Sequence, residues 1–333
     1  MKYTLWNRKK GVGKISTDTT LNIALSLLQK KLLVARPISK PTGSWQTISK
    51  KQIDLRAIEG ENFYKARRGA STDPYGVFWL EIIQVKSDGN LIASNLFEKG
   101  KWKIKQVTEV LESEFVYPAV SGKNIDRWNA TPREYVLIVQ DPKERKGYSE
   151  MIMKNNYPRT YSYLLKFKEI LLSRAAYKKY YADSNHPFYS QYNIADYSFT
   201  RYKVVWKRMA NDIIATVISQ YKTPFDYKTI ISTDTTSLIA TDDENEAHYI
   251  CSIINSVPVR EFIKSYSSAG RGFGAPSVMQ HIAIPKFESQ NEIHKKLTMI
   301  SKNCHKLKAE GKENELGRLE DDNDELVRTL FGI

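Results

Sequence analysis

Cysteine is almost absent from this sequence of 333 residues, which contains only Cys251 and Cys304. The pair has no metal-binding or redox spacing, and both residues occupy apolar positions of helical patterns. The five histidines are scattered and form no cluster with ligand-like spacing. These absences argue against a disulfide framework and a metal site, and they favour two buried thiols in a reducing compartment.

Long apolar runs are also missing. No uninterrupted apolar stretch reaches the length of about 18 residues that a membrane-spanning helix needs. The N-terminus lacks the apolar core and cleavage site of a signal peptide. We therefore expect a cytoplasmic protein with no membrane partner.

Acidic residues are few, because 37 Asp and Glu accompany 51 Lys and Arg and leave a formal net charge of +14. Residues 309–333 hold eight acidic and three basic residues, so this tail carries −5 and residues 1–308 carry +19. A body this basic favours a polyanionic partner such as nucleic acid, and a merely solubilising charge is the alternative. The 20 tyrosines and six tryptophans favour nucleic acid, because aromatic rings among basic side chains can stack on bases.

The first 50 residues contain a damaged nucleotide-binding pattern. The segment from Lys9 to Lys31 resembles the start of partition-type ATPases, but Lys10 replaces the first glycine and Ile15 replaces the hydroxyl residue that would hold Mg²⁺. The preferred interpretation is a basic loop that precedes an amphipathic helix over Leu21–Leu33.

Short apolar and aromatic runs predict the strands. Val77–Ile83 is so continuously apolar that we expect a central strand, buried on both faces, with antiparallel partners at Leu91–Phe97 and Trp102–Val107. Further strands are expected at Tyr135–Gln140, Lys203–Lys207, Ile213–Ser219, twice within Thr229–Thr241, and at His281–Pro285.

Helical spacing predicts one helix over Tyr157–Tyr181, with Lys166, Lys168, Arg174, Lys178 and Lys179 on a basic face, and another over Glu244–Lys264 that breaks near Pro258. After Phe287 the pattern predicts two helices that fold back on each other around Gly311, with acidic faces suited to packing or to a protein partner. The chain is thus expected to be α+β, with a mixed or antiparallel sheet and flanking helices. We expect an N-terminal segment (1–50), a target-recognition domain (51–290) and a C-terminal helical hairpin (291–333).

A glycine-rich loop within Tyr266–Phe287 is the centre of the predicted site. Its glycines permit positive φ and a close approach to a partner, and Arg271 supplies a charged fork for a phosphate or a guanine edge. Other basic side chains are expected at strand ends and in loops, where they can contact DNA. The candidate DNA-binding residues are Arg67, Arg68, Lys123, Arg127, Lys207, Arg208, Arg271 and Gly272.

Six blocks of the chain together resemble a known family. They are residues 63–82 (FYKARRGASTDPYGVFWLEI), 115–128 (FVYPAVSGKNIDRW), 157–177, 187–209, 246–267 and 270–287 (GRGFGAPSVMQHIAIPKF). Their order and spacing are similar to the TaqI-like specificity region of type IIG restriction–modification enzymes and N6-adenine DNA methyltransferases. The last block is also similar to the recognition domains of type I specificity subunits.

In that family a separate Rossmann-type domain binds S-adenosylmethionine and transfers its methyl group. This chain has no Asn/Asp-Pro-Pro-aromatic tetrapeptide and no glycine-rich cofactor loop at the appropriate place. The resemblance therefore implies a sequence-specific module for double-stranded DNA, without catalytic or cofactor residues of its own. S-adenosylmethionine is expected only in a methyltransferase or endonuclease domain or partner subunit. The alternatives are a methyltransferase or restriction-enzyme fragment that needs such a partner, a complete enzyme with unrecognised motifs, and a P-loop ATPase.

Overall fold

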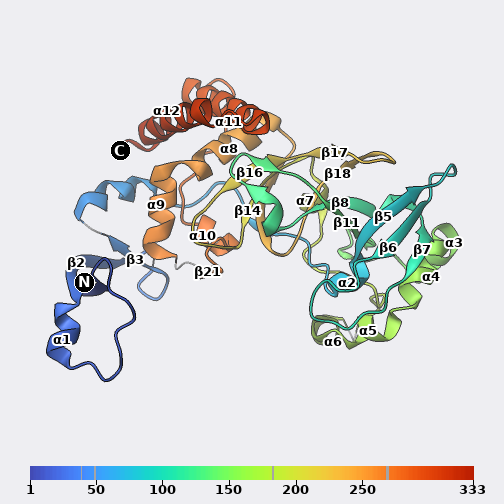
Figure 1. Ribbon diagram of the computed structural model, residues 1–333. Helices are drawn as coiled ribbons and strands as arrows, with labels where there is room; N and C mark the ends of the chain where they lie inside the picture. Colours follow the sequence, from blue (N-terminus) through green and yellow to red (C-terminus); the bar gives the residue numbers. More distant parts are fainter. Residues whose placement is uncertain (39, 49, 182–183, 268–269) are drawn as a thin grey trace.

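A computed structural model describes residues 1–38, 40–48, 50–181, 184–267 and 270–333; the side chains of residues 48, 50–53 and 271 lie outside that description. The chain forms an arch (Figure 1). A small N-terminal sheet stands at one end, a larger sheet with its helices stands at the other, and the C-terminal helices lie over the top. The fold is α+β, as the sequence predicts.

The N-terminal sheet has the order β1-β2-β3, with β1 at Lys2–Arg8, β2 at Leu28–Pro37 and β3 at Trp45–Ile48. The predicted helix over Leu21–Leu33 is wrong beyond its first turns. Helix α1 covers only Leu21–Ser26, and the chain then enters β2, which pairs antiparallel with all of β1. Strand pairing, which the local pattern does not show, overrides helix propensity here. The 3-10 helix η1 (Lys50–Ile58) follows β3.

The larger sheet has six strands in the order β19-β8-β11-β5-β6-β7, antiparallel except for the parallel pair β19–β8. The strands are β5 (Trp79–Val85), β6 (Leu91–Asn95), β7 (Thr108–Leu111), β8 (Val116–Val120), β11 (Glu134–Leu137) and β19 (Ile231–Ser232). The expected central strand begins two residues late, because Tyr75–Phe78 forms the single-turn helix α2. β5 is buried on both faces only at Trp79 and Leu80, where it pairs with β11; further on it pairs with β6 alone, and Ile83 is 57% exposed.

The strand expected at Trp102–Val107 is displaced to β7. The Asn95 side chain bonds the Lys105 carbonyl and the Val107 amide, so this stretch satisfies its backbone groups without a ladder. The predicted strand at Tyr135–Gln140 divides into β11 and the short β12 (Gln140–Asp141), which pairs with β13 (Lys146–Gly147).

Short helices cover the larger sheet: α3 (Glu150–Asn156), α4 (Pro158–Leu165), α5 (Lys168–Ser173) and α6 (Ala175–Tyr180). The single helix expected over Tyr157–Tyr181 is therefore wrong, since the chain breaks at Phe167 and Arg174. Arg174 is buried and donates to the carbonyl oxygens of Leu171 and Phe188, which removes it from the predicted basic face. A buried guanidinium needs such acceptors, and they fix the break.

A second, antiparallel sheet has the order β16-β14-β20-β4, with β16 at Ala215–Ile218, β14 at Tyr202–Lys207, β20 at Thr236–Thr241 and β4 at Arg67–Arg68. The strands predicted over Lys203–Lys207 and Ile213–Ser219 and on both sides of Asp234 are confirmed. Helices α8 (Glu244–Asn255) and α9 (Val257–Tyr266) follow, with the predicted break at Ser256 just before Pro258. Ala247, Ile250, Cys251 and Ile254 of α8 are fully buried, as their spacing predicts.

The predicted C-terminal pair is confirmed: α11 (Glu292–Glu310) and α12 (Glu313–Phe331) are joined at Gly311, whose φ of 72° ends α11. α11 packs on α8 and buries Leu297 and Cys304, and Cys251 and Cys304 are both free thiols. His305 of α11 accepts a hydrogen bond from the Val217 amide of β16. Burial lowers the pKa of His305 to about 4, so the neutral ring holds this contact.

The strand expected at His281–Pro285 is wrong. Ile282 forms one isolated bridge with Glu59, and the Ala283 amide bonds the carbonyl of Ile58. The facing segment is the end of a 3-10 helix and offers no extended edge.

Helix α10 (Pro276–Met279) precedes this stretch. The remaining short elements are η2 (Ser113–Phe115), η3 (Gly122–Asn124), β9 (Ile125–Asp126), β10 (Asn129–Ala130), α7 (Asp196–Phe199), β15 (Met209–Ala210), β17 (Gln220–Lys222), β18 (Tyr227–Thr229) and β21 (Gly270–Arg271).

Two large hydrophobic clusters hold the arch. One joins the second sheet to α8, α9, α11 and α12 around Trp206, Phe262 and Leu297. The other joins the larger sheet to α3, α4 and α5 around Phe78, Leu164 and Phe167. Within the described ranges, no helix has the length and apolar character needed to cross a bilayer. The described His, Cys, Asp and Glu residues form no group of three suited to a metal ion.

Candidate nucleic-acid interface

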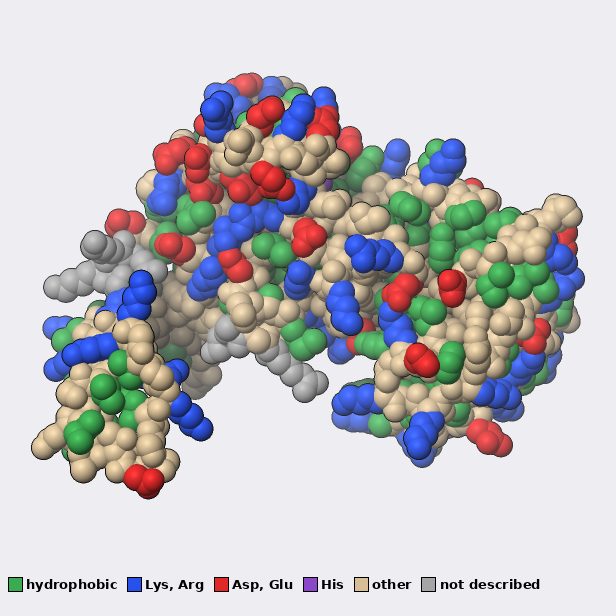
Figure 2. Space-filling view, in the orientation of Figure 1, with side chains coloured by type: hydrophobic (Ala, Val, Ile, Leu, Met, Phe, Trp, Pro, Cys, Tyr) green, Lys and Arg blue, Asp and Glu red, His purple; other side chains and the backbone are tan. Residues whose placement is uncertain are grey.

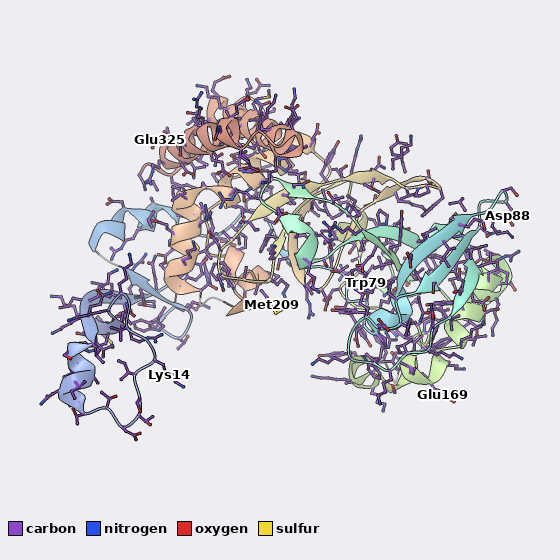
Figure 3. The ribbon with its side chains drawn as sticks, viewed as in Figure 1. Lys14, Trp79, Asp88, Glu169, Met209 and Glu325 are labelled. Atoms are coloured by element: carbon purple, nitrogen blue, oxygen red, sulfur yellow. The ribbon has the colours of Figure 1, made fainter. Side chains whose placement is uncertain are left out.

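A cavity of about 470 Å³ opens where the two main sheets meet. The larger sheet contributes Tyr75, Trp79, Lys99 and Gly100 from α2, β5 and the turn after β6, and Ser121, Gly122 and Lys123 from the loop after β8. The second sheet contributes Lys207 at the end of β14, and Met209 of β15 and Thr233–Thr235 just before β20 complete the lining. Figure 3 shows Met209 at the roof of the arch and Trp79 on its wall. Sequence segments far apart thus converge on one open, basic hollow.

The loop that carries Lys123 is rigidly built. The Asn124 side chain accepts hydrogen bonds from the Ser121 amide and hydroxyl, both at under 3 Å (2.9 and 2.7 Å). The Gly122 amide donates to the Thr235 hydroxyl of the second sheet at 2.9 Å. A Cβ atom at Gly122 would lie 3.2 Å from the Thr235 carbonyl oxygen, so only glycine fits without a shift. These bonds leave Lys123 exposed at the rim of the cavity, without an ion pair among the described side chains.

Asp234 is the acidic centre of this basic surface. Its carboxylate accepts from the Tyr75 hydroxyl at 2.7 Å and from Arg68 at 3.3 Å, and its carbonyl oxygen accepts from Arg208 at 2.9 Å. Burial raises the pKa of Tyr75, and the hydrogen bond to Asp234 raises this pKa further. Tyr75 therefore stays a neutral donor, and together with Arg68 it holds the Asp234 side chain in place.

Lys99 lies over the indole of Trp79, with its Nζ 4.0 Å from the ring centroid, and it also meets Glu134. This cation–π contact keeps the ammonium on the wall of the cavity. Together with Lys123 and Lys207, it places three cations around the opening. Such a set of charges suits the phosphates of a nucleic-acid backbone.

The glycine-rich loop lies beside β14. β21 pairs with β15, so that Arg271 is opposite Met209. The Gly274 carbonyl accepts from the Trp206 indole at 2.8 Å and from the Ser237 hydroxyl at 2.7 Å, while its amide donates to the Arg208 carbonyl. A Cβ at Gly274 would overlap the Lys207 carbonyl oxygen. The loop is thereby fixed next to the cavity, and Gly272 turns it with φ 93°.

Only some of the predicted site residues lie at the cavity. Lys123 and Lys207 line the cavity, and Arg68 and Arg208 hold Asp234 at its edge. Arg67 lies over the Tyr197 ring, 5.4 Å from its centroid, and Gly272 lies in the neighbouring loop. The side chain of Arg271 is outside the described part of the structure.

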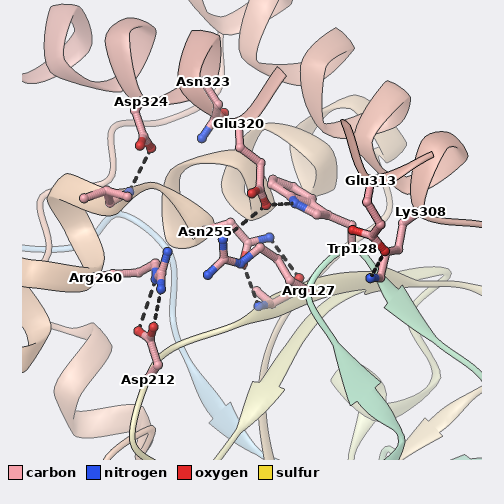
Figure 4. A network of polar contacts seen from close by, with 12 residues as sticks. Arg127, Trp128, Asp212, Asn255, Arg260, Lys308, Glu313, Glu320, Asn323 and Asp324 are labelled. Atoms are coloured by element: carbon pink, nitrogen blue, oxygen red, sulfur yellow. Dashed lines mark hydrogen bonds and ion pairs between the residues drawn. The ribbon is translucent and has the colours of Figure 1, made fainter. Parts of the chain in front are cut away.

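Arg127 lies apart from the cavity. Its guanidinium pairs with Glu320 of α12 at 3.1 Å, and the neighbouring Trp128 indole donates to the same carboxylate at 2.6 Å (Figure 4). Trp128 is buried and has φ 64°, which turns this segment toward the C-terminal helices. Sequence reasoning did not find Tyr75, Trp79 or Lys99 as cavity residues. Trp79 belongs to an apolar run typical of a core, and Tyr75 and Lys99 belong to ordinary turns.

The N-terminal segment does not have the geometry of a P-loop. β1 lies in an antiparallel sheet, twelve residues separate it from α1, and α1 has only six residues. Phosphate cradles of that type need a strand that leads through a tight glycine loop into a helix.

No family model matches the chain, and no curated protein matches it. The solved structures that are similar include two at 12% sequence identity. One is a DNA complex of the type IIL restriction–modification enzyme MmeI, with a TM-score of 0.49 over 83% of this chain and 34% of that one. The other is the type IIG restriction endonuclease BpuSI, with a TM-score of 0.35 over 88% of this chain and 37% of that one. The chain spans about a third of the length of these structures.

Proposed function

We propose that this chain is a recognition module for a specific sequence in double-stranded DNA, within a restriction–modification system, and that it has no methyl-transfer chemistry of its own. The observation that carries the proposal is the cavity between the sheets, which Lys99, Lys123 and Lys207 line together with the acceptor Asp234. Cations position a DNA backbone, and a fixed carboxylate beside a fixed hydroxyl can discriminate base edges. The net charge of +14 agrees with a polyanionic partner.

In this proposal the catalytic step belongs to a methyltransferase or endonuclease domain or subunit, which also binds S-adenosylmethionine. Residues 51–290 form the recognition domain, and the C-terminal hairpin (291–333), whose second helix is acidic, faces the catalytic partner. Arg68 and Arg208 add contacts at the edge of the cavity, and Arg67, Arg271 and Gly272 are further candidates for DNA contact. Arg127 serves the docking of α12, through Glu320.

Selection from a randomised duplex library at two salt concentrations tests the proposal. We expect one short motif to be enriched and to survive the higher salt, because base contacts depend less on salt than phosphate contacts do. Uniform binding that disappears with salt would contradict sequence recognition.

The double variant Lys123→Gln/Lys207→Gln then tests the cavity. We expect its salt slope, the change of log K with log salt, to fall by about two, because each substitution removes one phosphate-binding cation. Lys296→Gln/Lys306→Gln on α11 is the matched control, because it removes the same charge from exposed positions away from the opening of the arch. Equal slopes for the two double variants would place the DNA elsewhere.

A further inference from the structure

The N-terminal sheet carries a concentration of positive charge that the cavity does not explain. Residues 1–40 contain nine Lys and Arg and a single acid, Asp18. Arg36 pairs with Glu59 at 2.5 Å. The other eight make no ion pair with any side chain that the structure describes, and all eight are exposed. This many exposed cations without an ion pair indicate an anionic partner.

The strand register gathers several of these cations beside an aromatic ring. In the β1–β2 pair Trp6 is opposite Lys30, and Arg8 is two residues further on the same face. Trp6 is 45% exposed and β1 is the edge strand of its sheet. The following loop adds Lys9, Lys10 and Lys14, all exposed.

The glycines of this loop leave it open to close approach. A Cβ atom at Gly11 or Gly13 would meet nothing within 4 Å, so neither glycine is required by packing. Gly11 has φ 85°, which turns the chain at the end of β1. A bare, basic backbone of this kind can lie directly against a phosphodiester chain.

The loop lies on the open side of the arch. Figure 3 shows Lys14 on the flank of the N-terminal sheet that faces the opening, with Met209 at the roof and Trp79 on the opposite side. The space-filling view shows the same concavity, with basic side chains on both of its flanks (Figure 2). The cavity and the N-terminal loop are therefore two borders of one hollow.

We infer that the N-terminal sheet is a second DNA-binding element, a clamp arm that holds the sugar–phosphate backbone next to the recognised sequence without reading bases. Arg8, Lys9, Lys10 and Lys14 make the phosphate contacts, and Trp6 packs against a sugar beside Lys30. The inference rests on the proposed function, because the cavity must hold the duplex for the arm to reach its flank.

The test is the variant Arg8→Gln/Lys9→Gln/Lys10→Gln/Lys14→Gln in the full chain, measured against the duplex that the wild type selects. We expect the selected motif to stay the same, the salt slope to fall by about four, and affinity near physiological salt to drop by at least about 100-fold. Lys295→Gln/Lys296→Gln/Lys306→Gln/Arg318→Gln is the control, with the same charge loss on exposed positions of α11 and α12. A slope and affinity equal to those of this control would overturn the arm.

Two further measurements separate the sources of failure. A hydroxyl-radical reagent attached at Lys14→Cys should cut the duplex on one flank of the motif, and the same reagent at Lys306→Cys should not. The native Cys251 and Cys304 are buried, so each introduced thiol is the reactive one. Cutting no greater than that of the control would refute DNA binding by the N-terminal sheet. The library result would still support sequence recognition by the chain.

Vesicles of phosphatidylcholine and phosphatidylserine form the last comparison. Wild-type binding to them that the four-residue variant loses, with unchanged DNA affinity, would assign this surface to anionic lipid and overturn the inference. If the wild-type protein binds no duplex, both the proposed DNA recognition and the inferred clamp arm are overturned.

Discussion

The cavity between the sheets and the C-terminal helical pair use the same residue types for opposite purposes. Around the pair, several basic side chains are matched by acids: Arg127 with Glu320, Lys302 with Glu244, and Lys308 with Glu313. At the cavity, Lys123 and Lys207 have no ion-pair partner among the described residues, and the backbone around them is tied down by hydrogen bonds. The difference shows how charge can serve folding in one region and stay available to a ligand in another.

The largest expected effect comes from breaking the anchor of the glycine-rich loop. In Gly274→Ala the added methyl group collides with the Lys207 carbonyl, so the strand end and the loop must separate. We expect the free energy of unfolding to fall by about 3 kcal/mol, as is usual for strain at a close backbone contact. Urea denaturation checks this value, with Gly13→Ala as the control because its methyl group meets no atom.

DNA affinity of the same variant sharpens the comparison. A folded Gly274→Ala protein should also bind the selected duplex more weakly, since Lys207 and Met209 would leave their places at the cavity. Unchanged stability and affinity would show that the loop is not held as the structure indicates.

A smaller effect is expected at Lys203, which shares β14 with Lys207 but is fully buried and donates to the Thr200 carbonyl at 2.7 Å. Burial lowers the pKa of Lys203 from 10.5 to about 7. As the pH falls from 10.5 toward 7, this amine becomes protonated in the unfolded chain while it stays neutral in the folded chain. Lys203 therefore lowers the free energy of unfolding progressively over this range, and the loss is complete below pH 7.

Replacing this amine should therefore stabilise the protein near neutral pH. We expect Lys203→Met to raise the free energy of unfolding by about 2 kcal/mol at pH 7, and the gain over wild type to shrink toward pH 9.5. Denaturant titrations at several pH values measure the difference. Lys207→Met is the control on the same strand, and a gain that does not change with pH would show that Lys203 is not neutral in the folded state.

Sequence reasoning located single elements better than it located contacts between them. The C-terminal helices, the strands of the second sheet and the glycine-rich loop follow from periodicity and turn residues, which are local. The pairing of Tyr75 with Asp234 joins residues 159 positions apart, and no local signal specifies it. The helix expected at Leu21–Leu33 failed for the same reason, because β2 exists only through its pairing with β1.

The candidate site was predictable to a similar extent. Lys123 and Lys207 were found because exposed cations in loops and at strand ends are available to DNA. Arg127 had the same appearance in the sequence, yet its acidic partner lies on α12, 193 positions away. Only the tertiary structure shows which basic side chain forms an ion pair and which does not.

The smallest expected effect is at Glu320. Replacing it leaves Arg127 without its acidic partner, so that among the described residues this region has an unpaired cation, as the cavity does. Glu320→Gln removes the ion pair with Arg127, but its amide oxygen can still accept from the Trp128 indole. Both side chains of the pair are partly exposed, at 24% and 30%, so we expect a loss of only about 0.5–1 kcal/mol in the free energy of unfolding. Thermal denaturation at low and high salt measures it, and the loss should shrink as salt screens the pair. DNA affinity should stay at the wild-type value, because the released Arg127 lies away from the cavity; a tighter complex would show that Arg127 reaches the DNA once its acid is gone.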